Sequence, residues 1–307
     1  MNAYQIGLIT QSLISVISVA GLFALTSLGG MFSLGQAAYL CIGAYATFIL
    51  RHFAGMPLLV AAACSVVICA LVAWGVGLLT LKLRRDYFAL MSIALGQAVT
   101  SLVVVFRAYT GGAMGFTRIP RVAPFNLMLI TLGITILVLF CIRNFKYSRF
   151  GRMNLAQKND EIAAKSFGIN AYQLRIKTYI LAAIIGAIAG VLLALRARYI
   201  DNTVFGWALS VEMLIFLFFG GTNSITGAAI SAFFLKLLPA LLRGITIFGQ
   251  SMESYRIILY CVLIIVFINF RPAGLMGERE FSPGFFKMIY ENSLGRLISK
   301  KGKAADE

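Results

Sequence analysis

Long apolar runs separated by short polar segments make up most of the chain. A helix that crosses a membrane needs roughly 20 mainly apolar residues. Nine runs approach that length, at about residues 6–28, 32–50, 58–81, 87–106, 122–142, 178–196, 206–220, 226–243 and 255–270. They lack the period-two alternation of a membrane β-barrel strand. The pattern predicts an all-α polytopic membrane protein with about nine transmembrane helices, in a range of 8–10.

Composition agrees with a chain that is surrounded by lipid. Of its 307 residues, 60% are hydrophobic and only 12% are charged, and the mean hydropathy is +0.88. A soluble core cannot hide this much apolar surface. No basic segment precedes the first run, which follows "MNAYQ". We therefore interpret this run as a retained span and not as a cleaved signal peptide.

The positions of Lys and Arg predict how the chain is oriented in the membrane. Residues 143–177 contain eight basic and two acidic residues, and residues 271–303 add seven basic ones. Such clusters mark the cytoplasmic side of a bilayer. Four predicted spans separate the two clusters, so both lie on the same side. We expect a membrane domain at residues 1–277 with a cytoplasmic loop at about 144–177, and a basic cytoplasmic tail at residues 278–307.

The residues available for chemistry argue against several functional classes. The net charge is +16, but the basic residues flank spans and are not interleaved with aromatic residues, so nucleic acid is not an expected partner. A single histidine, His52, and the lack of a C-x-x-C pair leave no convincing metal site or Ser-His-Asp triad. No G-x-x-x-x-G-K-[ST] motif is present, so the chain has no P-loop of its own. We expect neither an enzyme nor a bound cofactor or metal.

A short charged helix is predicted inside the cytoplasmic loop, in "NLAQKNDEIAAKSFGIN". Asn159 suits the N-cap, and Gly168 suits the left-handed C′ position. A helix of about 8 residues is roughly 12 Å long, too short to be stable alone in water. It either lies on the lipid headgroups or docks on another protein. The residues assigned to it are Asn159, Asp160, Glu161, Ile162, Ala163, Ala164 and Gly168.

Several segments carry a resemblance to known proteins. "EIAAKSFGI", at residues 161–169, resembles the EAA-type loop of ABC importer permeases, a helix that inserts into a cleft of the ATP-binding subunit. Five further segments resemble, in the same order, parts of the branched-chain amino acid permeases of the LivM type. They are "FSLGQAAYLCIGAYA", "DYFALMSIALGQ", "TGGAMGFTRIP", "SVEMLIFLFFGGTNSITGAAISA" and "RPAGLMG".

The resemblance implies that residues 1–277 are the permease domain of an ABC importer in a bacterial inner (cytoplasmic) membrane. The implied substrates are leucine, isoleucine and valine, and similar systems carry urea, amides or aromatic acids. The implied partners are a second permease chain of the LivH type, two ATP-binding subunits that bind the ATP, and an extracytoplasmic substrate-binding protein. The short helix then couples ATP-driven closure of those subunits to alternating access of the spans.

Three glycine pairs interrupt apolar runs, at residues 29–30, 111–112 and 220–221. Each pair either ends a helix at the headgroups or breaks a helix inside the membrane, which is tolerated only beside protein or a water-filled cavity. Because Ser, Thr or Asn lies near each pair, we favour a translocation path. The residues assigned to this path or its gate are Ser33, Gln36, Gly111, Gly112, Glu212, Gly220, Gly221, Asn223 and Ser224.

Two charges, Glu212 and Lys236, lie within apolar runs. A charge at bilayer depth costs roughly 3 kcal/mol on insertion scales, so these two should face the bundle interior or each other. Glu212 either locks two helices through a hydrogen bond or acts as a gate, and Lys236 alternatively snorkels to an interface. An ion-coupled secondary transporter that uses Glu212 and Lys236 is the alternative function.

The chain departs from the family pattern at two places. Asn223 replaces a glycine of the family's G-G-x-G-S-x-x-G-A run. Because Asn tolerates the left-handed conformation, we expect the turn to be kept. Ala113 and Met114 stand where members often carry Ser and Asn, so the choice among the substrates stays open.

Overall fold

The computed structural model describes residues 3–83, 85–117, 119–241, 246–247, 250–251, 260, 262, 265 and 274–277, and the regular elements among these residues are helices and one short hairpin. The longer helices are α1 (Ala3–Phe23, continued by a π-helix at Ala24–Leu28), α2 (Gln36–Phe53), α3 (Leu58–Thr80), α4 (Arg85–Val105), α6 (Pro124–Tyr147), α9 (Ala171–Ala197), α10 (Trp207–Gly220) and α11 (Ile225–Leu241). The shorter elements are α5 (Arg107–Thr110), α7 (Arg149–Asn159), α8 (Glu161–Ser166), two 3₁₀ turns (Gly112–Met114 and Thr203–Phe205) and the antiparallel strands β1 (Thr246–Ile247) and β2 (Gln250–Ser251).

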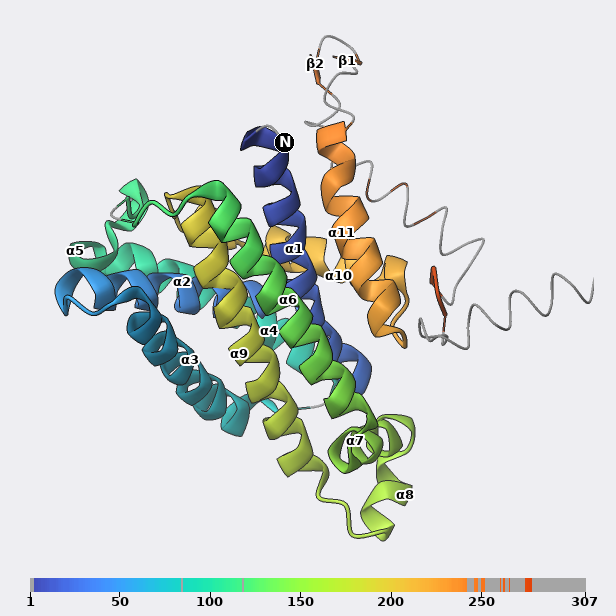
Figure 1. Ribbon diagram of the computed structural model, residues 1–307. Helices are drawn as coiled ribbons and strands as arrows, with labels where there is room; N and C mark the ends of the chain where they lie inside the picture. The colour runs from blue at the N-terminus through green and yellow to red at the C-terminus, as the bar shows by residue number, and fades with distance from the viewer. Residues whose placement is uncertain are drawn as a thin grey trace, which may run out of the picture.

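The helices form a bundle with two distinct ends (Figure 1). α7 and α8 lie at one end, which we call the α8 end, whereas α5, the start of α1 and the hairpin lie at the opposite end. α1 and α9 occupy the centre: 78% of the apolar stretch of α1 and 72% of that of α9 are buried, against 22% for α3 and α4. α1 packs against α6, α9, α10 and α11.

The outer helices present apolar side chains on their exposed faces. Leu59 and Leu71 of α3 are exposed, as are Ile136 and Phe140 of α6. Leucine, isoleucine and phenylalanine are the residues that membrane insertion favours, so these faces suit contact with lipid tails.

Glycines allow α2 and α9 to approach each other closely. A Cβ on Gly190 would overlap the carbonyl oxygen of Leu40, and one on Gly43 would lie 2.5 Å from the Cα of Ala187. Small residues at such crossings let helix backbones touch in a membrane. The small residues of "GAIAG", at residues 186–190, therefore allow this close contact.

α2 begins inside the bundle and not at its end. The non-helical segment 29–35 precedes it, and two serines from other helices hold the junction. The Leu34 N–H donates to Ser92 Oγ of α4 (2.9 Å), and the Ala37 N–H donates to Ser210 Oγ of α10 (3.0 Å). α10 is also short, because its 14 residues reach about 21 Å at 1.5 Å per residue. Both features suit helices that are broken inside the bundle, and breaks at membrane depth stay a prediction.

The structure confirms an all-α polytopic membrane protein. The first eight predicted spans coincide with helices, and six helices in the described part are long and apolar enough to cross a membrane. α2, which has Arg51 and His52 in its last turn, and the 17-residue α11 are not among those six. The ninth run, 255–270, and the tail, 278–307, lie outside the described residues apart from isolated positions in the run. The count of nine stays a prediction.

Candidate functional site

α8 begins with a side-chain cap from Asp160. The Oδ1 of Asp160 accepts from the N–H groups of Ile162 (2.9 Å) and Ala163 (3.0 Å), which have no partner inside the helix. The sequence assigned this cap to Asn159, which is instead the last residue of α7. Asp160 is extended (φ −146°, ψ 107°) and serves both as the C-cap of α7 and as the N-cap of α8. The helix is therefore six residues long, shorter than expected.

The end of α8 has the left-handed glycine that the sequence predicts. Gly168 has φ +75°. The Ile169 N–H donates to the Ala164 carbonyl (3.2 Å) and the Gly168 N–H donates to the Lys165 carbonyl (2.9 Å). This is the Schellman pattern, which satisfies the last carbonyl groups of a helix. It turns the chain directly into α9.

Arg175 of α9 joins α8 to its neighbours. It pairs with the carboxylate of Glu161, which also pairs with Lys165 at 3.0 Å. The hydrogen bond from Lys165, with the nearby Arg175, holds the pKa of Glu161 below its usual value. The Gln157 side chain of α7 lies between Arg175 and the Ala171 carbonyl. With its amide oxygen toward Arg175, it accepts from Arg175 Nε (2.6 Å), and its amide nitrogen donates to the Ala171 carbonyl (3.2 Å). Movement of α8 is thereby tied to α7 and α9.

Two apolar side chains of this region face solvent. Ile162 is 82% exposed and Phe167 is 86% exposed, whereas Ala164 is buried against the bundle. A hollow of about 550 Å³ lies beside α8 and includes Lys82 at the end of α3. Exposed apolar side chains beside charged ones suit contact with a partner protein or with lipid headgroups. We call Ile162, Phe167 and this hollow the α8 surface.

Lys158 of α7 contacts both glycine turns at the α8 end. Its Nζ donates to the carbonyl of Ser27, in the π-helix that ends α1, at 3.0 Å. It also donates to Oδ1 of Asn223, in the turn between α10 and α11, at 3.4 Å. Lys146 Nζ, at the end of α6, donates to the Asn223 carbonyl at 2.7 Å. α7 is thus connected to the ends of α1 and α10.

Asn223 plays a different part in the turn between α10 and α11 from the one that the sequence predicts. Arg198 is the only non-glycine residue with positive φ in the described part of the chain, so Asn223 does not use the left-handed conformation. Gly221 takes the positive φ of this turn, with φ +106° and ψ 126°. Asn223 instead supplies a side-chain acceptor for Lys158, which a glycine lacks.

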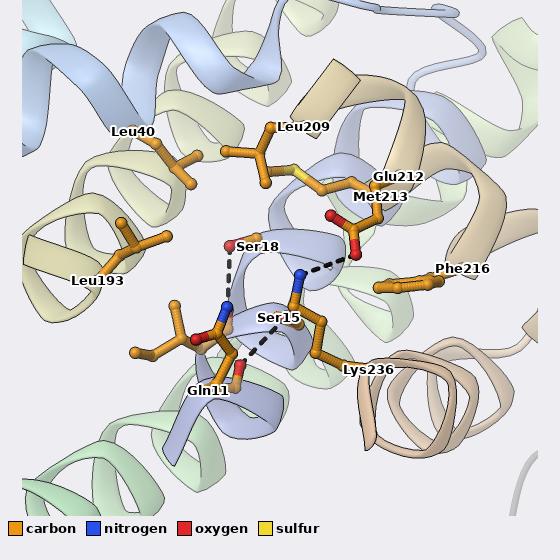
Figure 2. A pocket seen from close by; sticks show the side chains of 11 residues that line it. Gln11, Ser15, Ser18, Leu40, Leu193, Leu209, Glu212, Met213, Phe216 and Lys236 are labelled. Carbon is orange, nitrogen blue, oxygen red and sulfur yellow. Dashed lines mark hydrogen bonds and ion pairs between the residues drawn. The ribbon is translucent and has the colours of Figure 1, made fainter. Parts of the chain in front are cut away.

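Glu212 and Lys236 face each other between α10 and α11. Lys236 Nζ lies 2.7 Å from Glu212 Oε1, and the two side chains are 12% and 14% exposed. They border a small cavity of about 30 Å³ together with Gln11, Ser15 and Ser18 of α1 (Figure 2). The two charges were expected to face the bundle interior or each other; they face each other, and the ion pair replaces the alternative of a snorkelling lysine.

The remaining residues assigned to the path do not form one site. Ser33 and Gln36 are buried near the start of α2, where Gln36 Nε2 donates to the Ala182 carbonyl of α9 (2.9 Å). Ser224 Oγ caps α11 by accepting from the Gly227 N–H (3.1 Å). Gly220 ends α10 beside Gly221. Gly111 and Gly112, with φ +79° and +59°, lie at the opposite end of the bundle.

Sequence reasoning missed the side chains that connect these parts. In the sequence, Lys158 and Arg175 stand out only as two of the basic residues that mark the cytoplasmic loop. In the structure each of them bridges elements that are distant in the sequence. Ser92 and Ser210 also lie inside apolar runs. A polar side chain in such a run is the one sequence signal that could have identified them. Among the described residues, no group of three or more His, Cys, Asp or Glu side chains is placed to hold a metal ion.

Comparison with known proteins supplies the family. Residues 4–267 match the family model described as "Branched-chain amino acid transport system / permease component". LivM of Salmonella typhimurium is 24% identical, over 89% of this chain and 70% of its own length. BraD of Pseudomonas aeruginosa is 25% identical, over 88% of this chain and 96% of its own length. Both are high-affinity branched-chain amino acid transport system permease proteins.

A solved structure has the same fold. PsaBC from Streptococcus pneumoniae, in complex with Fab, superposes with a TM-score of 0.50 at 16% identity and covers 87% of this chain and 91% of its own. That likeness concerns the fold alone. With most of its length matched by the family model, the chain belongs to the family of branched-chain amino acid transport system permease components.

Proposed function

We propose that the chain forms half of the translocation path of an ABC importer in a bacterial inner membrane. The other half is a second permease chain of the LivH type, and two ATP-binding subunits drive alternating access. An extracytoplasmic binding protein delivers the substrate. In this proposal the chain binds no ATP, metal or cofactor itself, and its C-terminus is cytoplasmic.

The α8 surface is the observation that carries the proposal. A six-residue helix would not persist alone in water. Here a cap, a Schellman turn and Arg175 hold it, and the exposed Ile162 and Phe167 are left available for a partner. Its links to α7 and α9 provide a mechanical route from a docked ATPase to the spans.

Leucine, isoleucine and valine are the proposed substrates, with a related small polar solute as the wider class. Support comes from relatives whose names state branched-chain amino acid transport. At 24–25% identity, a change of pocket residues is compatible with the shared fold. The choice within the class therefore needs a binding measurement.

Purification of the tagged chain from native membranes tests the assembly. We expect ATP-binding subunits and a second permease to co-purify, and hydrolysis to rise when the binding protein and its amino acid are added. Replacement of Ile162 and Phe167 by Ser should remove the ATPase subunits without preventing insertion. Assembly unaffected by both replacements would contradict docking at the α8 surface.

The Glu212–Lys236 pair favours one alternative, an ion-coupled secondary transporter. A buried carboxylate beside an ammonium group is the kind of element that proton-coupled carriers use. The two functions differ in their energy source. Uptake into proteoliposomes that persists without a proton gradient but needs ATP supports the importer, whereas uptake that collapses with the gradient while ATP remains supports the alternative.

A further inference from the structure

Two arginines border a hollow at the end of the bundle opposite α8. Arg196 lies in the last turn of α9 and Arg198 is the C-cap of that helix. The hollow has a volume of about 350 Å³ and lies between the start of α1, the start of α6 and the end of α9. Leu127 and Leu195 give it apolar walls. These helix ends stand at one boundary of the membrane-spanning bundle (Figure 1).

Arg196 is partly buried and has few protein partners. Its Nε donates to the carbonyl of Gly7 in α1 at 3.0 Å, which uses one of the five N–H donors of a guanidinium. The ion pairs found among the described residues involve Glu161 or Glu212, and none includes Arg196 or Arg198. A desolvated cation is normally paired, so a negatively charged group would suit this hollow.

The backbone of Arg198 supplies a second, independent observation. Its φ of +59° is the only positive value among the described non-glycine residues. Glycine or asparagine would suit this C-cap better. The strained conformation is held by the following residues, since Phe116 and Ile200 form a two-way β-bridge (2.7 and 3.2 Å). A strained residue that its surroundings enforce is often one whose side chain is in use.

We propose that this hollow binds the phosphate group of a glycerophospholipid from the adjacent leaflet. Arginine is suited to phosphate because its planar fork donates two parallel hydrogen bonds. The apolar walls would contact the glycerol and the first methylenes of the acyl chains, which a free anion does not have. The site does not depend on what the protein transports, so its test is separate from the test of the proposed function.

Photo-crosslinking tests the site in a bilayer. A photoreactive phenylalanine analogue replaces Val122, which lines the hollow, and the chain is placed in nanodiscs of phosphatidylethanolamine and phosphatidylglycerol. We expect a lipid adduct by mass spectrometry. Arg196→Gln and Arg198→Asn should each lower its yield about tenfold, because each removes charge-assisted hydrogen bonds. Arg51→Gln, in the last turn of α2, is the matched control and should leave the yield unchanged.

The unfolding temperature of the variants and competition by inorganic phosphate show whether a lower adduct yield reflects loss of the lipid site. Arg198→Asn places a residue that tolerates positive φ, so its unfolding temperature should not fall. A lower adduct yield at unchanged stability supports the site. The proposal is overturned if both arginine variants keep the wild-type yield, if excess inorganic phosphate abolishes the adduct, or if the adduct in native membranes is a protein and not a lipid.

Discussion

Lys158 is the side chain through which α7 reaches the ends of α1 and α10. Lys158→Met keeps the stem that packs on Gly30 but removes the hydrogen bonds to the Ser27 carbonyl and to Asn223 Oδ1. Such bonds to a charged group contribute about 1.5–3 kcal/mol each. If they transmit motion from α7, substrate transported per ATP hydrolysed should fall about tenfold. Uptake and hydrolysis measured together in proteoliposomes check this.

Asn223→Gly, which restores the glycine of the family pattern, is the matched comparison. It removes one acceptor of Lys158 and leaves the bond to Ser27, so we expect a smaller loss. In the double variant the two effects should not add, because both changes remove the same contact. Normal coupling in Lys158→Met would show that this lysine only stabilises the fold.

Glu212 is expected to lock α10 to α11. Glu212→Ala leaves Lys236 charged and nearly buried without its partner, which should destabilise the protein by about 3–5 kcal/mol. Glu212→Gln keeps an acceptor for the lysine, so assembly and most transport should survive. Thermal unfolding in detergent and uptake in proteoliposomes measure the two effects.

A paired replacement separates a lock from a gate. Replacing both Glu212 and Lys236 by Leu removes both buried charges, and it should be more stable than either single replacement. If Glu212 is instead a gate, the equilibrium between the inward-open and outward-open states depends on its charge. Uptake by Glu212→Gln below about a tenth of wild type, with unchanged stability, would favour the gate; tenfold corresponds to 1.4 kcal/mol.

At the scale of elements, the end of α8 depends on one backbone angle. Gly168 has φ +75°, and a Cβ built there would meet no atom within 4 Å. Any effect of substitution therefore arises from the backbone and not from a clash. Gly168→Val should disrupt the turn and the ATPase contact, whereas Gly168→Asn, which tolerates positive φ, should keep both.

Co-purification of the ATP-binding subunits and stimulated hydrolysis measure that difference. The two variants place side chains of similar size at the same exposed position, so lost docking in both would indicate that the surface itself rejects a side chain. Docking retained in both would mean that the Schellman turn is not needed to present Ile162 and Phe167.

The elements were predictable where a repeated pattern specifies them. Long apolar runs gave the spans, and the glycine after "EIAAKSF" gave the end of α8. The start of α2 was not predictable, because it depends on Ser92 and Ser210 binding single backbone N–H groups from distant helices. The N-cap was misplaced by one residue because Asn159 and Asp160 both suit that position, and the end of α7 decides between them.

At the scale of the whole molecule, the order of the family-like segments along the chain was a better guide to the family than any single motif. Five loosely matching segments in one order pointed to the family that the match over residues 4–267 shows. The Glu212–Lys236 contact was one of the arrangements that the sequence left open, because a charge at bilayer depth needs the bundle interior, a partner or an interface. The glycine pairs at residues 29–30 and 220–221 lie at one end of the bundle and the pair at 111–112 lies at the other, as the number of predicted spans between them requires.

Orientation in the membrane is the prediction at this scale. Ala113 and Ser166 are exposed residues on the two sides of α6, one at each end of the bundle. In a cysteine-free background, an impermeant maleimide added to intact cells should label Ala113→Cys and not Ser166→Cys, because the positive charge of the loop predicts a cytoplasmic position. Both should react after membrane disruption, which controls for accessibility. Labelling of Ser166→Cys alone would reverse the orientation and place the α8 surface away from any source of ATP. Labelling of both in intact cells would mean that α6 does not cross the membrane.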